Sequence, residues 1–152
     1  MNPGDIHIMI SHAQKVAQAY DHTGVKVFRI DALTHGVGGG VDAHAGDTPA
    51  GDYRATGLVQ TTDADTSATW AAYGPWFVAL DDLEGQERSR SRAGIGMHGG
   101  GTGLPDPQAN RQDLIPTCGC IRIHNHDLAT LIVPLVKHAL ANGLEFLVTV
   151  GP

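Results

Sequence analysis

The chain has 152 residues, 41% of them hydrophobic and 17% charged, with a formal net charge of −6 at pH 7. This length suits one ordinary domain, so we expect residues 1–152 to fold as a single unit. The apolar fraction argues against disorder, and the acidic balance argues against a nucleic-acid partner. No run approaches the roughly 20 apolar residues of a membrane span, so no membrane insertion is expected.

Glycine is common, at 20 residues, whereas aromatic residues make up only 5%, which favours a turn-rich, mainly β domain. Alternation of apolar and polar residues predicts strands at 6–10 and 25–30, while residues 14–20 fit either a strand or a short helix. Later strands are expected at 53–61, 76–80, 94–98 and 144–150.

One clear helix is predicted over residues 127–142. Asp127 is suited to cap its start, an apolar stripe follows, and Gly143 is suited to end it. Pro134 predicts a kink or an early break inside it. The polar stretch before Pro116 predicts a long loop, and such loops in compact domains are often functional.

The residues best suited to catalysis are Cys118 and Cys120, which flank Gly119, and His98 upstream of them. The thiolate is the reactive form of cysteine, and a nearby imidazole can remove the thiol proton. Gly119 permits a tight turn that can aim neighbouring N–H groups at a developing oxyanion. These residues predict a cysteine acyl-transfer site.

The same residues carry a family resemblance. His98 and Gly99, then Thr117-x-Gly119-Cys120-Ile121-Arg122-x-x-Asn125, resemble the signature of the YkuD-type L,D-transpeptidase catalytic domain. The resemblance extends over nearly the whole chain, including the Thr-Pro-x-Gly turn at residues 48–51. It implies a mainly β, sandwich-like or barrel-like fold with one helix after the catalytic cysteine.

The resemblance also implies an activity. Members of this family attack peptidoglycan stem peptides between the L-centre of a diamino acid and the following D-alanine, and form a thioester. Transfer to an amine gives a cross-link, and transfer to water gives L,D-carboxypeptidase activity. No metal or organic cofactor is implied.

By matching position, the resemblance makes Cys120 the nucleophile and His98 the general base that later protonates the leaving amine. The Gly99 carbonyl would orient the histidine ring, and the N–H groups of Gly119 and Cys120 would form the oxyanion hole. Arg122 would hold the geometry of the site or a substrate carboxylate. The expected substrate-side residues are Arg122, Thr117, Cys118, Asn125 and Tyr73, with Thr117 and Asn125 expected to fix the loop rather than to react.

Cys118 is a departure, because the family usually has histidine two residues before the nucleophile. If that histidine only lines the pocket, Cys118 is a tolerated variant. We favour this interpretation because His98 already supplies the base. A disulfide between Cys118 and Cys120 could act as a reversible lock on the nucleophile. Its small ring would be strained and easily reduced, so on the sequence alone we interpret it as an oxidation artefact.

Two other function classes remain open. Cys118, Cys120, His124 and His126 could bind zinc, although their spacing is not that of usual structural zinc sites. The chain could also be a wall-binding or virion structural module that keeps the fold without turnover.

The other candidate residues have simpler explanations. His35 and His44 could lie near the substrate, whereas the Arg-Ser alternation at residues 88–92 is more typical of a solvated loop. Early histidines such as His7 and His12 suit hydrogen-bonded structural roles. The aromatic cluster Trp70, Tyr73 and Trp76 could line a groove but fits a hydrophobic core better.

The expected place of action is the bacterial cell wall, in the periplasm or outside the cell. Residues 1–5 lack the basic and apolar regions of a secretory signal, which suggests a trimmed chain, a phage-encoded enzyme or a secreted effector. The sequence does not determine the oligomeric state.

Overall fold

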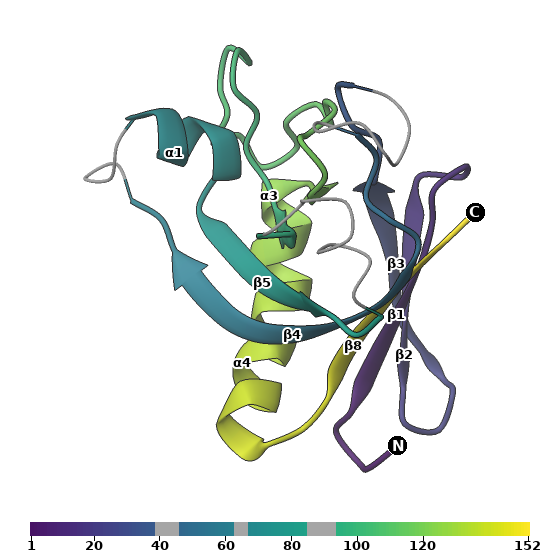
Figure 1. Cartoon of the computed structure of the whole chain (residues 1–152). Helices are drawn as coiled ribbons and strands as arrows, with labels where there is room; N and C mark the ends of the chain where they lie inside the picture. Colours follow the sequence, from purple (N-terminus) through teal and green to yellow (C-terminus); the bar gives the residue numbers. More distant parts are fainter. Residues whose placement is uncertain (39–45, 63–66, 85–93) are drawn as a thin grey trace.

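The computed structural model describes residues 1–38, 46–62, 67–84 and 94–152. Eight strands close a barrel in the order β1-β2-β3-β7-β6-β5-β4-β8, with a helix at one side (Figure 1). The strands are β1 Ile6–Ser11, β2 Val16–Asp21, β3 Lys26–Leu33, β4 Gly51–Gln60, β5 Trp76–Asp82, β6 Gly96–His98, β7 Ile121–Ile123 and β8 Phe146–Gly151. The helical segments are α1 Ser67–Tyr73, α3 Asn125–Asp127, the π-helical η1 Leu128–Ile132, and α4 Val133–Asn142.

The barrel is mixed. β1 pairs in parallel with β8, and β6 pairs in parallel with β7, whereas the other pairs are antiparallel. Alternation along β1 and β8 sends every second side chain inward, and Ile8 is paired with Val148 in the fully buried core. Each such side chain contributes about 1.5–3 kcal/mol by leaving water.

The predicted mainly β, barrel-like fold with a helix after Cys120 is confirmed. Most of the ambiguous stretch 14–20 belongs to strand β2, and the other predicted strands match observed ones with shifted ends. Strand β7 and helix α1 were not predicted. β7 is only three residues long, and all three are buried, so it has no alternation to recognise.

The C-terminal helical stretch departs from its prediction at the start. It begins at Asn125 with His124 in the N-cap position, so the expected capping role of Asp127 is wrong. Asp127 lies inside the first turn. Its carboxylate accepts a hydrogen bond from Arg111 Nη1 at 2.8 Å.

Pro134 does not end the helix. It occupies the first turn of α4, directly after η1, where the absence of a proline N–H is tolerated. The end of the helix is confirmed at Gly143, whose φ of 64° is the left-handed conformation that glycine adopts easily.

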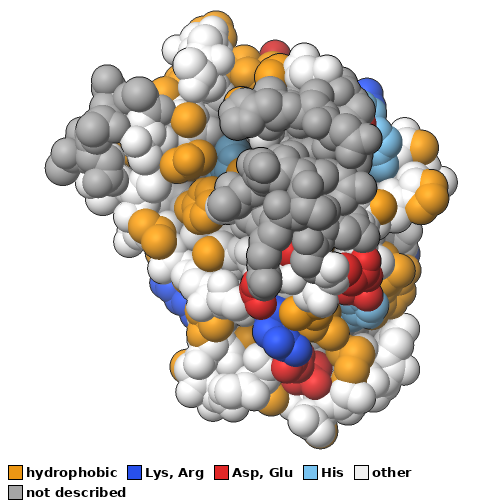
Figure 2. All heavy atoms as spheres, viewed as in Figure 1, with side chains coloured by type: hydrophobic (Ala, Val, Ile, Leu, Met, Phe, Trp, Pro, Cys, Tyr) orange, Lys and Arg blue, Asp and Glu red, His pale blue; other side chains and the backbone are white. Residues whose placement is uncertain are grey.

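Helix α4 packs against β4, β5 and β8 (Figure 1). Its buried side chains include Val136 and Ala139, which belong to the same core as the strands. Residues 99–116 form a long connection without helix or strand, as predicted. Within the described ranges, no helix has the length and apolarity required to cross a membrane. On the face in Figure 2, the Lys and Arg side chains of described residues appear as separate spots.

Candidate active site

Parallel pairing of β6 with β7 brings the two halves of the sequence motif together. In this register Met97 lies beside Ile121, and His98 lies beside Arg122. Cys120 directly precedes β7, and continuing the same register backward places it beside Gly96, two residues before His98 on β6. The pairing thereby brings the two ends of the long connection between β6 and β7 close together.

The His98 ring is buried and held in one orientation. Its Nδ1 donates a hydrogen bond to the Gly99 carbonyl oxygen at 2.8 Å. The rings of Tyr73 and Phe77 lie 4.9 and 5.8 Å from it, centroid to centroid. A carbonyl oxygen only accepts hydrogen bonds, so Nδ1 carries the hydrogen and Nε2 keeps its basic lone pair.

Burial lowers the pKa of His98 to about 4, with a smaller contribution in the same direction from the Arg122 charge. The hydrogen bond to Gly99 opposes this shift. His98 is therefore neutral at pH 7 and able to accept a proton.

Arg122 is buried and ties three segments together. Its Nη1 donates to the carbonyl oxygens of Gly99 at 2.7 Å and Ala72 at 3.2 Å, and its Nε donates to Ile115 at 2.9 Å. Burial lowers the pKa of Arg122, and the charges of Cys120 and Cys118 act in the opposite direction. The Gly99 carbonyl thus accepts from both His98 and Arg122.

Two threonines hold the segment that carries Cys120. Thr117 Oγ1 donates to the Cys120 carbonyl oxygen at 2.7 Å and accepts from the Gly119 N–H at 3.0 Å. Thr48 Oγ1 lies 2.8 Å from the Gly119 carbonyl oxygen and 3.2 Å from that of Cys120. Gly119 has a φ of 119°, a conformation that side chains other than glycine rarely adopt.

Six of the predicted site residues line one cavity of about 400 Å³: Tyr73, His98, Thr117, Cys118, Cys120 and Arg122. The Cys120 thiol donates a weak hydrogen bond to the Gly94 carbonyl oxygen, 3.7 Å from Sγ. Both cysteines are free thiols, with Cys118 exposed and Cys120 half-buried.

Asn125 lies behind this cavity. Its Oδ1 accepts from the Gly100 N–H at 2.9 Å, and its Nδ2 donates to the carbonyl oxygens of Pro107 and Ala109 at 2.8 and 2.7 Å. A Cβ at Gly99 would overlap Asn125 Oδ1, so glycine is required at that position. Every amide atom of Asn125 is thus used to hold loops together.

Three supports of the site were not predicted from the sequence. Buried Gln112 accepts from the Asn125 N–H at 2.9 Å and gave no signal in the sequence. Thr48 was noted only as part of a turn. Helix α1 is the third support, because its Ala71 carbonyl oxygen accepts a hydrogen bond from the Gly101 N–H at 2.7 Å. The alanines of this helix have high helix propensity and could have indicated it.

The aromatic cluster divides between two roles. Only Tyr73 lines the cavity. Trp76 packs against the core, and Lys137 Nζ lies 4.7 Å from its ring centroid. Trp70 is half-buried and accepts a hydrogen bond from Gln108 on its carbonyl oxygen.

The histidines with proposed structural roles are hydrogen-bonded as expected: His7 to Thr149 Oγ1 and His12 to Thr34 Oγ1, each at 2.7 Å. His35 stacks on His12 at 3.8 Å and is not among the residues that line the cavity. His44 and residues 88–92 lie outside the described residues.

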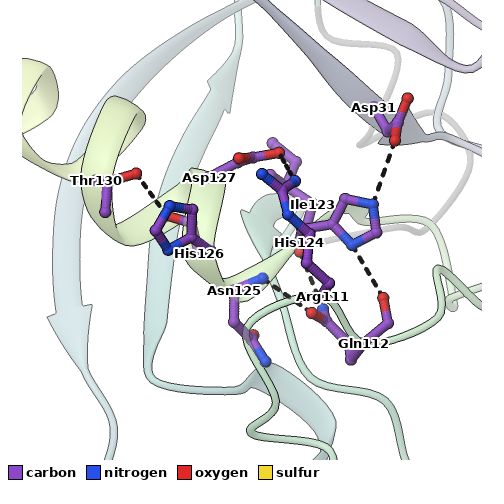
Figure 3. Close-up of polar contacts among 9 residues, drawn as sticks. All are labelled: Asp31, Arg111, Gln112, Ile123, His124, Asn125, His126, Asp127 and Thr130. Atoms are coloured by element: carbon purple, nitrogen blue, oxygen red, sulfur yellow. Dashed lines mark hydrogen bonds and ion pairs between the residues drawn. The ribbon is translucent and has the colours of Figure 1, made fainter.

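The zinc alternative has no site in the described ranges, where no three His, Cys, Asp or Glu side chains are placed to hold a metal. His124 contacts the Gln112 carbonyl oxygen at 2.9 Å and Asp31 at 3.3 Å. Figure 3 shows the His126 ring on the opposite side of the chain from the His124 ring. The two imidazoles therefore cannot form a chelating pair in this conformation.

Comparison with known proteins identifies the family. The family model of the L,D-transpeptidase catalytic domain, YkuD, matches residues 5–134. The chain belongs to the YkuD L,D-transpeptidase family. Comparison with curated proteins gives no match.

Among solved structures, Bd1075 from Bdellovibrio bacteriovorus aligns with a TM-score of 0.59 at 15% identity, over 98% of this chain and 48% of that one. The helical cell shape determining protein Pgp2 from Campylobacter jejuni aligns with a TM-score of 0.57 at 19% identity, over 96% and 47%. L,D-transpeptidase 3 from Mycobacterium tuberculosis, solved with a faropenem-derived adduct, aligns with a TM-score of 0.52 at 16% identity, over 99% and 59%. These likenesses concern the fold, and this YkuD chain spans about half to three-fifths of the solved chains.

Proposed function

We propose that this YkuD-family chain is a cysteine acyl-transfer enzyme that acts on peptidoglycan stem peptides as an L,D-transpeptidase, an L,D-carboxypeptidase or both. The observation that supports this most directly is one cavity lined by Cys120 and by a buried, neutral His98. In this proposal residues 1–152 form the catalytic domain, and the site of action is the bacterial cell wall.

The first step is removal of the Cys120 thiol proton by His98. With Nδ1 committed to the Gly99 carbonyl oxygen, Nε2 is the nitrogen that accepts the proton. The Cys120 thiol donates a weak hydrogen bond to the Gly94 carbonyl oxygen, and it gives up that contact when its proton passes to His98. Hydrogen bonds of catalytic groups often tighten only when substrate is bound.

The thiolate then attacks the carbonyl carbon of the substrate at the L-centre of the diamino acid. The N–H groups of Gly119 and Cys120 are the proposed donors to the oxyanion, a contribution of about 3 kcal/mol in other enzymes. The Gly119 N–H already donates to Thr117 Oγ1, so the threonine hydroxyl has to yield it to the oxyanion. Thr117 thereby holds the Gly119 donor in place before substrate arrives.

Collapse of the tetrahedral intermediate breaks the amide bond and forms a Cys120 thioester. His98, now protonated, gives its proton to the departing D-alanine amine and is ready to activate the acceptor. An amine acceptor gives a cross-linked peptide, and water gives a shortened one. Tyr73, Thr117, Cys118 and the guanidinium of Arg122 lie where the two peptides would bind.

Incubation of the reduced protein with tetrapeptide muropeptides tests this proposal. Expected products are free D-alanine, cross-linked dimers, or both. Mass spectrometry of the intact protein should detect a thioester adduct that vanishes in Cys120→Ala. The adduct should persist in Cys118→Ala, which assigns it to the second thiol.

The control is His22→Gln, which replaces an exposed histidine in the turn between β2 and β3. Turnover that survives Cys120→Ala would refute a cysteine nucleophile. A folded, reduced protein without product or adduct would favour a module that has kept the fold but not the reaction.

A further inference from the structure

Cys118 differs from its neighbours in that no described residue forms a hydrogen bond with it. The flanking residue Thr117 is anchored by its N–H to the His35 carbonyl oxygen at 3.2 Å and by its carbonyl oxygen to the Val37 N–H at 2.8 Å. Gly119 and Cys120 are anchored through their carbonyl oxygens to Thr48. Across the described part of the chain, Cys118 has no such hydrogen bond, and its side chain is exposed.

The two thiols also share one environment. Both line the cavity that contains His98. Both interact electrostatically with the buried guanidinium of Arg122. In the steps proposed above Cys118 only lines the place where the peptides would bind, and its thiol transfers neither a proton nor an acyl group.

The backbone permits the two sulfurs to meet. Two residues along a chain span at most about 7 Å between Cα atoms, and a disulfide needs about 4.4–6.8 Å. The chain bends at residues 118–120, which shortens this span, and Gly119 between the cysteines already has a φ of 119°. Cys118 can turn inward without breaking a hydrogen bond with any described residue.

We infer that Cys118 is a resolving thiol, which traps a peroxide-oxidised Cys120 as a reversible intramolecular disulfide. The Cys120 thiolate attacks one peroxide oxygen, the O–O bond breaks, and hydroxide leaves, giving a sulfenic acid. The Cys118 sulfur then attacks the Cys120 sulfur and forms the S–S bond. The hydroxyl group departs with the Cys118 proton as water, and a dithiol later restores both thiols.

This device would be a protective off-state. A disulfide at Cys120 removes the nucleophile while it also blocks further oxidation to the irreversible sulfinic and sulfonic acids. A strained small ring is readily reduced, which suits a temporary lock better than a structural bond. Its regulatory meaning rests on the proposed function, whereas disulfide formation itself does not.

The test exposes the reduced protein and Cys118→Ser to hydrogen peroxide, blocks remaining thiols with iodoacetamide, and reads intact and peptide masses. The unmodified chain should lose the mass of two hydrogens, on one peptide that contains both cysteines. Cys118→Ser should instead gain the oxygens of sulfinic and sulfonic acid on Cys120. After dithiothreitol, each protein's free Cys120 is compared with its own untreated sample, and we expect about tenfold more recovery in the unmodified chain.

A matched variant, Cys120→Ser, shows whether oxidation begins at Cys120, because its Cys118 should then oxidise more slowly than Cys120 does in Cys118→Ser. Equal over-oxidation of Cys120 with and without Cys118, or disulfides only between molecules, would overturn the inference. Turnover of muropeptides without the internal disulfide would leave the proposed function standing alone. A reversible internal disulfide in a protein without Cys120-dependent turnover would refute the proposed enzymatic function and support the resolving role of Cys118.

Discussion

His98 and His124 differ both in how far they lie from Cys120 along the sequence and in their surroundings. His98 is buried among aromatic rings, and its Nδ1 is bonded to a backbone carbonyl. His124 is half-buried in an outer polar cluster, where its two ring nitrogens contact Gln112 and Asp31 (Figure 3). The same side chain is suited to proton transfer in one place and to holding loops in the other.

The difference arises from solvation and partners. Burial of His98 disfavours the charged form and leaves Nε2 basic toward the cavity. At His124, the Gln112 carbonyl and the Asp31 carboxylate face the ring and leave no nitrogen directed at a reacting group. Fold position, not residue type, decides which histidine can act as a base.

Replacement of each histidine by glutamine should separate the roles of His98 and His124 most clearly. His98→Gln should lower kcat for muropeptide turnover by about 10²–10⁴-fold, because general bases contribute about that much. His124→Gln should change it by less than about threefold, since it removes only loop contacts. Equal losses in the two variants, with the fold preserved by circular dichroism, would refute the distinct role of His98.

Acid should reveal the low pKa of His98 in the free energy of unfolding. Between pH 6.5 and about 4, the unfolded chain binds a proton that the folded chain excludes, so stability falls as the pH is lowered. The loss from this group should total about 3 kcal/mol, following 1.36 kcal/mol per pKa unit. Urea unfolding at several pH values measures it.

The reference for that experiment is His98→Gln, which lacks the titrating group. Its stability should vary less steeply over the same pH range than that of the unmodified chain. Parallel pH profiles for the two proteins would show that His98 titrates normally in the folded state.

The hydrogen bonds of Asn125 behind the cavity should contribute more to the free energy of unfolding than the ion pair of Arg111 with Asp127. Asn125→Ala leaves the Gly100 N–H and the carbonyl oxygens of Pro107 and Ala109 without their partner, at a cost of about 2–3 kcal/mol. Arg111→Gln removes an ion pair whose arginine is 59% exposed, at a cost of about 1 kcal/mol or less. Urea unfolding of both variants would contradict this order if Arg111 proved the more costly.

A smaller effect than at His98 or Asn125 is expected at Thr48, which positions the nucleophile segment without lining the cavity. Thr48→Val should cost about 1 kcal/mol of stability and lower kcat by about threefold to tenfold with little change in KM. Thr48→Ser keeps the hydroxyl and should restore most of kcat. A change in KM alone would point instead to a contact with substrate.

Several elements could be predicted because their pattern is local. Alternation identified β1 and β3, and Gly143 marked the end of the helix through its left-handed backbone. The start of that helix was misplaced because His124 occupies the cap position without a side-chain hydrogen bond, so the usual capping signal is missing. β7 escaped because three buried residues carry no period.

The candidate site could be predicted only where its residues are recognisable from local sequence. His98, Gly119 and Cys120 were singled out because their chemistry and order are visible in the sequence. Gln112 was not, because a glutamine in a polar loop resembles any solvated residue until its neighbours are known. Asn125 was grouped with the substrate-side residues and expected to fix the loop, and its amide does bond to backbone groups of the loop.

By itself, the sequence determined the mainly β class, the pair of residues suited to thiol chemistry and the family that they resemble. Only the tertiary structure decided which histidine is desolvated, which thiol is anchored and which side chains support the cavity. These properties depend on groups far apart in the chain, such as Thr48 beside Gly119 and Tyr73 beside His98. Local patterns specify strands and turns, but burial and hydrogen bonding arise only when distant segments pack together.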